Sequence, residues 1–134
     1  MPSGILAAHN YYRKKVGSSP LMWSSRLASV AQDWANYLIQ NGTYKHRPDL
    51  HYGENLFEVV GPPVDEKQVV DAWAAERSSY DHRRNVCSGR CGHYTQIVWR
   101  DTRRVGCGLA QKRRREVWVC NYDPPGNIVG ERPY

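Results

Sequence analysis

The sequence predicts an α+β fold in which helices come first and strands follow. Three observations support this class. Apolar residues recur at helical spacing through residues 3–80, the spacing changes toward alternation after Cys91, and turn signals separate the segments. A chain of 134 residues suits one domain, so 1–134 is expected to fold as a single unit. Hydrophobic residues make up 40% of it, which is enough to fill a core.

Two helices are expected in the first 42 residues. The first runs over about 3–15 and ends before Gly17. The second is capped by Ser24 or Ser25 and is stopped by Asn41-Gly42. The apolar stripe of the second helix consists of Leu27, Val30, Ala31, Trp34 and Leu38.

A third helix is expected to start near Asp65, directly after the turn residues Gly61-Pro62-Pro63. One side of this helix carries Val69, Val70, Trp73, Arg77 and Tyr80. The pattern therefore extends the third helix as far as Tyr80.

Strands are expected in the C-terminal part of the chain. The segment Thr95–Trp99 is rich in β-formers, and His93 would lie at its start on the same face as Thr95. Two further strands, Val105–Ala110 and Val117–Tyr122, flank a polar connection and form a hairpin.

The four cysteines allow three disulfide pairings, and the predicted hairpin favours one of these pairings. If the hairpin turn is centred between Arg113 and Arg114, Cys107 and Cys120 are equidistant from it and lie opposite each other. Opposed residues of an antiparallel pair have Cβ atoms about 4.5–5.5 Å apart, close to what a disulfide requires. The sequence therefore predicts Cys107–Cys120, which leaves Cys87–Cys91 as a short local loop.

The net charge of +6 allows several kinds of partner and selects none. It is compatible with acidic polysaccharide, anionic lipid or nucleic acid, although a soluble surface with basic turns is the favoured explanation. No stacking motif or zinc-finger spacing supports nucleic acid. The basic clusters are Arg83-Arg84, Arg103-Arg104 and Lys112-Arg113-Arg114-Arg115.

Cysteine usage and the absence of an apolar span favour a secreted protein. An even number of cysteines is typical of an oxidising compartment. No apolar run approaches the roughly 18 residues of a membrane span. The first residues lack the features of a signal peptide, so we expect the sequence to represent a mature form with a start methionine.

Histidines and carboxylates are the candidates for chemistry. His46 follows the second helix, Glu54 lies in Tyr52-Gly53-Glu54-Asn55-Leu56, and Glu76 follows Trp73 on the third helix. Two neutral imidazoles with carboxylates suit a zinc-type ion that keeps room for water. By spacing alone this signal is weak, because lone histidines commonly form hydrogen bonds within a core.

Several ordered motifs resemble the CAP superfamily, which comprises cysteine-rich secretory, antigen-five and pathogenesis-related proteins. The resemblance covers about residues 3–134. Its C-terminal motifs are Gly53-Glu54-Asn55-Leu56, Gly92-His93-Tyr94-Thr95-Gln96-Ile97-Val98-Trp99 and Cys120-Asn121-Tyr122-Asp123-Pro124-Pro125-Gly126-Asn127. Its N-terminal motifs are His9-Asn10-Tyr11-Tyr12-Arg13, Pro20-Leu21-Met22-Trp23 and Ala31-Gln32-Asp33-Trp34-Ala35.

The resemblance implies an α-β-α sandwich with a central antiparallel sheet, and a cleft with two histidines and two glutamates. Carried over by motif, these are His46, Glu54, Glu76 and His93, which would hold a divalent metal such as zinc. His51 is a rival to His46 because the loop between them varies in length, and motif order favours His46. Plant members usually have six cysteines. The two missing here would partner the equivalents of Cys107 and Cys120, which leaves these two free to join each other.

The function implied by the resemblance is that of a secreted, non-enzymatic, monomeric binding protein. It would bind a sterol or another lipid in defence or host interaction, with peripheral membrane contact possible and no transmembrane segment. One alternative is a zinc-dependent hydrolase in which Glu54 or Glu76 acts as base. Another is a precursor that releases residues 124–134 as a signalling peptide, although a structural turn and a packed tail are the favoured explanation of this segment.

Overall fold

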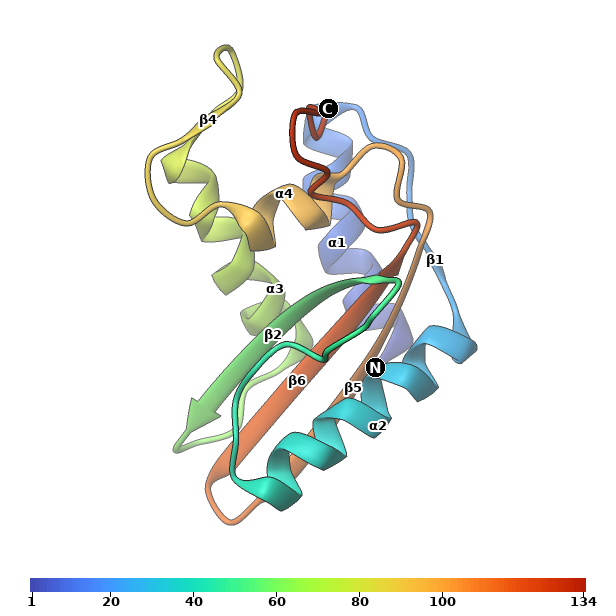
Figure 1. Cartoon of the computed structure of the whole chain (residues 1–134), viewed down its shortest axis with the longest axis vertical. Helices are drawn as coiled ribbons and strands as arrows, with labels where there is room; N and C mark the ends of the chain where they lie inside the picture. Colours follow the sequence, from blue (N-terminus) through green and yellow to red (C-terminus); the bar gives the residue numbers. More distant parts are fainter.

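The computed structural model describes residues 1–134 as three layers, with a sheet between helices (Figure 1). Helix α2 (Ser25–Asn41) covers one face of the sheet. The other three helices, α1 (Pro2–Val16), α3 (Glu66–Ala74) and α4 (Gly92–Val98), pack together on the opposite side. The predicted α+β class and the α-β-α sandwich are therefore confirmed.

Local signals set both ends of α2 and the start of α3. Ser24 caps α2 by accepting a hydrogen bond from the Leu27 N–H at 3.1 Å, and Gly42 ends it in the left-handed conformation. Asp65 caps α3 in a reciprocal capping box with Gln68. The prediction that this helix continues to Tyr80 is wrong. It tightens into a 3₁₀ turn, Ala75–Ser79, before the two-residue strand β3 (Tyr80–Asp81).

The C-terminal hairpin is confirmed with the predicted centre. Strands β5 (Arg104–Lys112) and β6 (Arg115–Asp123) pair in antiparallel fashion across a turn at 113–114. Cys107 lies opposite Cys120, and the two form a disulfide. The second disulfide joins Cys87, in β4 (Val86–Cys87), to Cys91. Both predicted pairings are therefore present.

Two strands that the sequence did not indicate complete the sheet. Strand β2 (Gly53–Val60) pairs with β6 along its whole length, so Glu54 lies opposite Asn121. Strand β1 (Met22–Trp23) pairs with β5 in parallel, which makes the sheet mixed. The strand order is β1-β5-β6-β2, and its three long strands are antiparallel as the resemblance implied.

The strand predicted at Thr95–Trp99 is wrong, because Thr95–Val98 belong to helix α4 and Trp99 directly follows it. All residues from Tyr94 to Val98 are buried. The segment therefore has no exposed side whose periodicity would distinguish a helix from a strand. Tertiary contacts support the helix instead. Arg13 donates to the carbonyls of Ile97 and Trp99 at its end, and Glu76 accepts from the backbone N–H of His93 at its start.

The sheet separates two hydrophobic cores. On β6, Val117 and Val119 face α2, whereas Trp118 and Cys120 face the other helices. Gly108 lets α2 approach the sheet closely, since a Cβ there would lie 2.5 Å from the Cα of Gln32. None of the helices is both long enough and apolar enough to cross a membrane.

Candidate functional site

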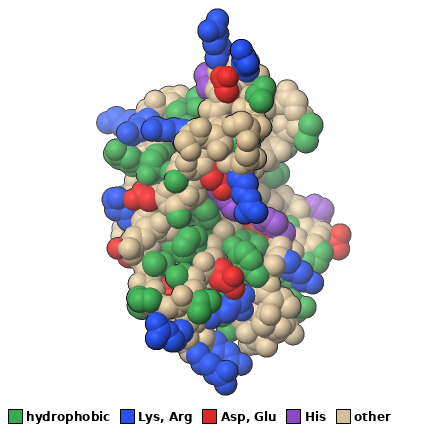
Figure 2. Space-filling model, turned by 90° about the vertical axis from the view of Figure 1, so that its left-hand side faces the viewer, with side chains coloured by type: hydrophobic (Ala, Val, Ile, Leu, Met, Phe, Trp, Pro, Cys, Tyr) green, Lys and Arg blue, Asp and Glu red, His purple; other side chains and the backbone are tan.

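A cleft of about 620 Å³ brings together the four residues predicted for the site. His46, Glu54, Glu76 and His93 all line it, although they come from four separate segments of the chain. His51 does not line the cleft, so the preference for His46 agrees with the geometry. On the face shown in Figure 2, histidine, acidic and basic side chains meet near a hollow at mid-height.

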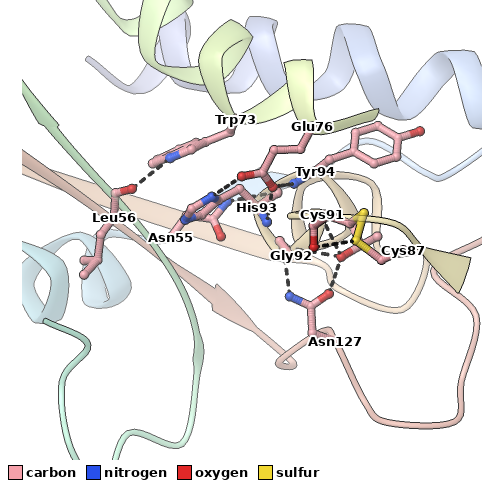
Figure 3. A network of polar contacts seen from close by, with 12 residues as sticks. Asn55, Leu56, Trp73, Glu76, Cys87, Cys91, Gly92, His93, Tyr94 and Asn127 are labelled. Atoms are coloured by element: carbon pink, nitrogen blue, oxygen red, sulfur yellow. Dashed lines mark hydrogen bonds and ion pairs between the residues drawn. A yellow bond between two sulfur atoms is a disulfide. The ribbon is translucent and has the colours of Figure 1, made fainter. Parts of the chain in front are cut away.

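His93 and Glu76 form the first of two imidazole–carboxylate pairs (Figure 3). The Nδ1 atom of His93 lies 2.7 Å from Oε2 of Glu76. The other oxygen, Oε1, accepts from the backbone N–H of His93 at 2.9 Å and of Tyr94 at 3.3 Å. Glu76 thus caps helix α4 and orients the imidazole at its start. The Trp73 ring stacks on His93 at a centroid distance of 6.0 Å and fixes the ring plane.

His46 and Glu54 form the second pair. The Nδ1 atom of His46 lies 2.7 Å from Oε1 of Glu54, and the same oxygen accepts from the Arg47 N–H at 3.0 Å. The loop is held by Trp34, whose indole N–H donates to the Lys45 carbonyl at 3.0 Å. The Glu54 side chain is only 4% exposed, whereas that of His46 is 67% exposed. A buried carboxylate therefore holds an imidazole that is itself exposed to solvent.

Both pairs leave the same ring nitrogen unoccupied. A carboxylate at Nδ1 favours the tautomer with the proton on Nδ1, which leaves a lone pair on Nε2. Neither Nε2 has a hydrogen-bond partner within the protein. The hydrogen bond from Glu54 raises the pKa of His46, with the charge of Glu54 adding to it and burial opposing it. Nε2 of His46 is therefore protonated at a higher pH than in a free histidine.

Amide side chains that the sequence did not single out support the cleft. Asn55 donates to the His93 carbonyl at 3.1 Å and to the Tyr122 hydroxyl at 3.2 Å. Asn127 donates to the Gly92 carbonyl at 2.9 Å and accepts from the Thr95 hydroxyl at 2.6 Å. Both asparagines lie within motifs that carry the family resemblance, but the sequence of these motifs does not reveal what the side chains do.

The end of the chain forms one wall of the cleft. Its lining residues are Asn127, Ile128, Val129, Gly130, Glu131 and Pro133. The Arg100 N–H donates to the Pro133 carbonyl at 2.7 Å. The Tyr134 ring stacks on His82 at a centroid distance of 4.2 Å, and His82 Nε2 lies 2.9 Å from a main-chain oxygen of Tyr134. The predicted packed tail is thus observed, and it contributes to the site.

The donor atoms that the cleft offers to a cation are those of its two imidazoles. No group of three or more His, Cys, Asp or Glu side chains is arranged so that it could hold a metal ion. Each glutamate instead contacts an imidazole and the backbone. What the cleft offers is two imidazole Nε2 atoms, each backed by a carboxylate, the arrangement found behind metal-bound histidines. Oε2 of Glu54 adds a buried acceptor without a partner. A metal held here would keep positions for water or another ligand.

Comparison with known proteins extends over almost the whole chain. The model of the cysteine-rich secretory protein family, CAP, matches residues 6–122. The basic form of pathogenesis-related protein 1 from Nicotiana tabacum is 42% identical, and the match covers 99% of this chain and 75% of that protein. Pathogenesis-related protein 1A from the same plant is 45% identical over 96% of this chain and 78% of that protein.

Solved structures share the fold. Venom allergen-like protein 4 of Schistosoma mansoni has a TM-score of 0.80 at 27% identity, covering 99% of this chain and 92% of that one. The structure of NaASP2 with Zn²⁺ has a TM-score of 0.79 at 22% identity, covering 99% and 84%. With the family model, the plant relatives and the layered fold in agreement, the chain belongs to the CAP family of cysteine-rich secretory proteins.

Proposed function

We propose that this chain is a secreted, non-enzymatic binding protein whose cleft holds a divalent metal of the zinc class through His46 and His93. The observation that carries the proposal is the pairing of both Nδ1 atoms with carboxylates at 2.7 Å. This pairing favours the tautomer that presents Nε2 to a cation. Two disulfides and relatives named pathogenesis-related proteins support secretion and a role in defence.

The rest of the cleft suits ligand binding better than turnover. A bound divalent ion would supply Lewis acidity and a coordination position for an external donor group. Both oxygens of Glu76 and Oε1 of Glu54 are already engaged as acceptors for the imidazoles and for backbone N–H groups, and Oε2 of Glu54 is buried. A carboxylate used in this way positions a histidine and is poorly placed to exchange protons with a substrate. The structure of NaASP2 with Zn²⁺ shows that a protein of this fold has been studied with that metal.

We also propose that the protein binds a sterol or another lipid, and a second surface suits such a ligand. A groove of about 610 Å³ lies between α1 and α3. The small residues Gly4, Ala7 and Ala8 of α1 leave space for it. Tyr11 and Tyr12 line the same groove, and aromatic rings with a polar edge suit an amphipathic molecule. Acidic residues at the start of α3 form the rim, so a hydroxyl group of a sterol would find acceptors there.

Thermal unfolding in the presence of zinc tests the metal site. At pH 7.5, zinc at a hundred-fold excess over its Kd should stabilise the folded protein by about 2.7 kcal/mol. His46→Ala combined with His93→Ala should remove this increment, whereas His51→Ala, an exposed histidine outside the cleft, should retain it. At pH 5 the increment should fade because protonated imidazoles cannot bind the ion. No shift at millimolar zinc would refute the metal site.

The same variants separate binding from hydrolysis. If the cleft were a zinc hydrolase, Glu54→Gln or Glu76→Gln would abolish turnover of a defined ester or peptide substrate while zinc still raised the melting temperature. We expect the wild-type protein to show no such turnover. Competition between labelled cholesterol and unlabelled ergosterol, measured with and without zinc, tests the lipid surface separately.

A further inference from the structure

The end of helix α2 carries a sequence that the cleft does not explain. Asn41-Gly42-Thr43 has the form Asn-x-Ser/Thr with a residue other than proline in the middle, and no other triplet of this form occurs in the chain. In proteins that pass through the secretory pathway of eukaryotes, this triplet is the acceptor of N-linked oligosaccharide. A short motif of this kind also arises by chance, so its structural setting decides whether it can serve.

The acceptor side chain is accessible at the surface. Asn41 is exposed and is the last residue of α2, and Gly42 turns the chain away with φ of 60°. The only partner of the Asn41 amide is the Tyr37 carbonyl, which accepts from Nδ2 at 2.9 Å on the exposed side of the helix. An Asn Nδ2 that carries a sugar keeps one N–H, so this hydrogen bond and the helix end are compatible with the modification.

Thr43 provides a second, independent observation. Its Oγ1 atom is buried and has no hydrogen-bond partner in the folded protein. A buried hydroxyl without a partner is unfavourable, and a valine of the same shape would avoid the penalty. The folded state therefore gives no reason for a hydroxyl at this position. Recognition of the unfolded chain as a glycosylation acceptor does give one, because the triplet requires the hydroxyl of Ser or Thr.

We propose that Asn41 is an N-glycosylation site when the protein is secreted from a eukaryotic cell. The inference rests on the secretion put forward under the proposed function. In the reaction, Nδ2 of Asn41 attacks the anomeric carbon of an oligosaccharide linked to a polyprenyl pyrophosphate. The new bond joins that carbon to Nδ2, the bond from the carbon to the pyrophosphate oxygen breaks, and the polyprenyl pyrophosphate leaves. One amide proton is lost to the medium.

The glycan would lie at the end of the molecule away from the cleft. Asn41 lines a hollow of about 700 Å³ with Lys112, Arg113 and Arg114 of the β5–β6 turn. Figure 1 shows the C-terminal end of α2 beside this turn, opposite the end where α4 and the C-terminus lie. These three cations have no ion-pair partner within the chain. A glycan at Asn41 would therefore cover the basic turn and leave the zinc cleft open.

Expression with a secretory leader in a eukaryotic host tests the site, because the leader imposes passage through the pathway. Intact mass should exceed that of the polypeptide by the mass of an N-glycan, and a peptide:N-glycosidase should remove the excess. The enzyme converts a glycosylated Asn into Asp, so the tryptic peptide Leu27–Lys45 should carry Asp at position 41 and Asn at position 36.

Matched variants make the result specific. Asn41→Gln and Thr43→Ala should each abolish the modification, whereas Thr43→Ser should retain it and Asn36→Gln, at another exposed asparagine of α2, should not affect it. Secreted wild-type protein with unmodified Asn41, in cells that glycosylate a co-expressed acceptor protein, would overturn the inference. The zinc-induced rise in melting temperature should be equal in the glycosylated protein and in Asn41→Gln. A missing zinc response would count against the cleft alone.

Discussion

Protonation of His9 should destabilise the fold in a defined pH window. His9 is 0% exposed, and it accepts a hydrogen bond from the Tyr122 hydroxyl at Nε2 while Nδ1 donates to the Ile5 carbonyl, at 2.7 and 2.8 Å. Burial, opposed by the Ile5 hydrogen bond and reinforced by the positive charge of Arg13, lowers the pKa of His9 to about 4. The folded state therefore holds this imidazole neutral well below the pH at which an unfolded chain protonates it.

The size of the effect follows from the two pKa values. Because the folded pKa is lower than the unfolded value of about 6.5, stability is lost as the pH falls below 6.5, and the loss is complete near the folded pKa of about 4. The gap corresponds to about 3 kcal/mol in total, and about 2 kcal/mol of it is lost by pH 5. Above pH 7 His9 contributes no pH dependence.

Urea unfolding at pH 7.5 and pH 5 measures this loss. His9→Gln is the matched variant, because its amide oxygen can still accept from Tyr122 but cannot be protonated. The wild type should lose about 2 kcal/mol more than the variant between these pH values. An NMR titration of the wild type, which needs no variant to fold, should show His9 neutral at pH 5. Parallel pH dependence in the two proteins, or titration of His9 near pH 6.5, would refute the reasoning.

Other predictions concern packing and the C-terminal segment. Arg13→Met should lower the free energy of unfolding by on the order of 3–5 kcal/mol in urea, because it leaves the buried carbonyls of Ile97, Trp99 and Thr102 without their charged donor. Gly108→Ala should cost about 1–3 kcal/mol in the same assay, since its Cβ meets the α2 backbone. Native protein treated with protease should release no peptide of residues 124–134, as judged by mass spectrometry, because the Arg100–Pro133 hydrogen bond and the packed Tyr134 hold the segment. Release from the native state would favour a peptide precursor.

The sequence predicted those parts of the fold that depend on neighbouring residues. The hairpin and its disulfide follow from the equal distance of Cys107 and Cys120 from one turn, and the helix caps at Ser24 and Asp65 are local as well. Strand β2 was missed because it gains its definition from pairing with β6, a partner distant in the sequence. Helix α4 was misread because Tyr94–Val98 are all buried, so this stretch lacks the exposed polar face that reveals a helix.

For the site, motifs identified the residues but not their roles. A motif with two histidines and two glutamates is compatible with two arrangements. In one, all four residues are metal ligands; in the other, each carboxylate holds an imidazole and only the imidazoles bind the metal. The hydrogen bonds distinguish them, because Glu76 accepts from two backbone N–H groups and from His93 Nδ1, which commits both of its oxygens. Only Glu54 keeps a free oxygen. The glutamates of the cleft are therefore unequal: replacing Glu76 should disturb helix α4 as well as His93, whereas replacing Glu54 should act mainly on His46.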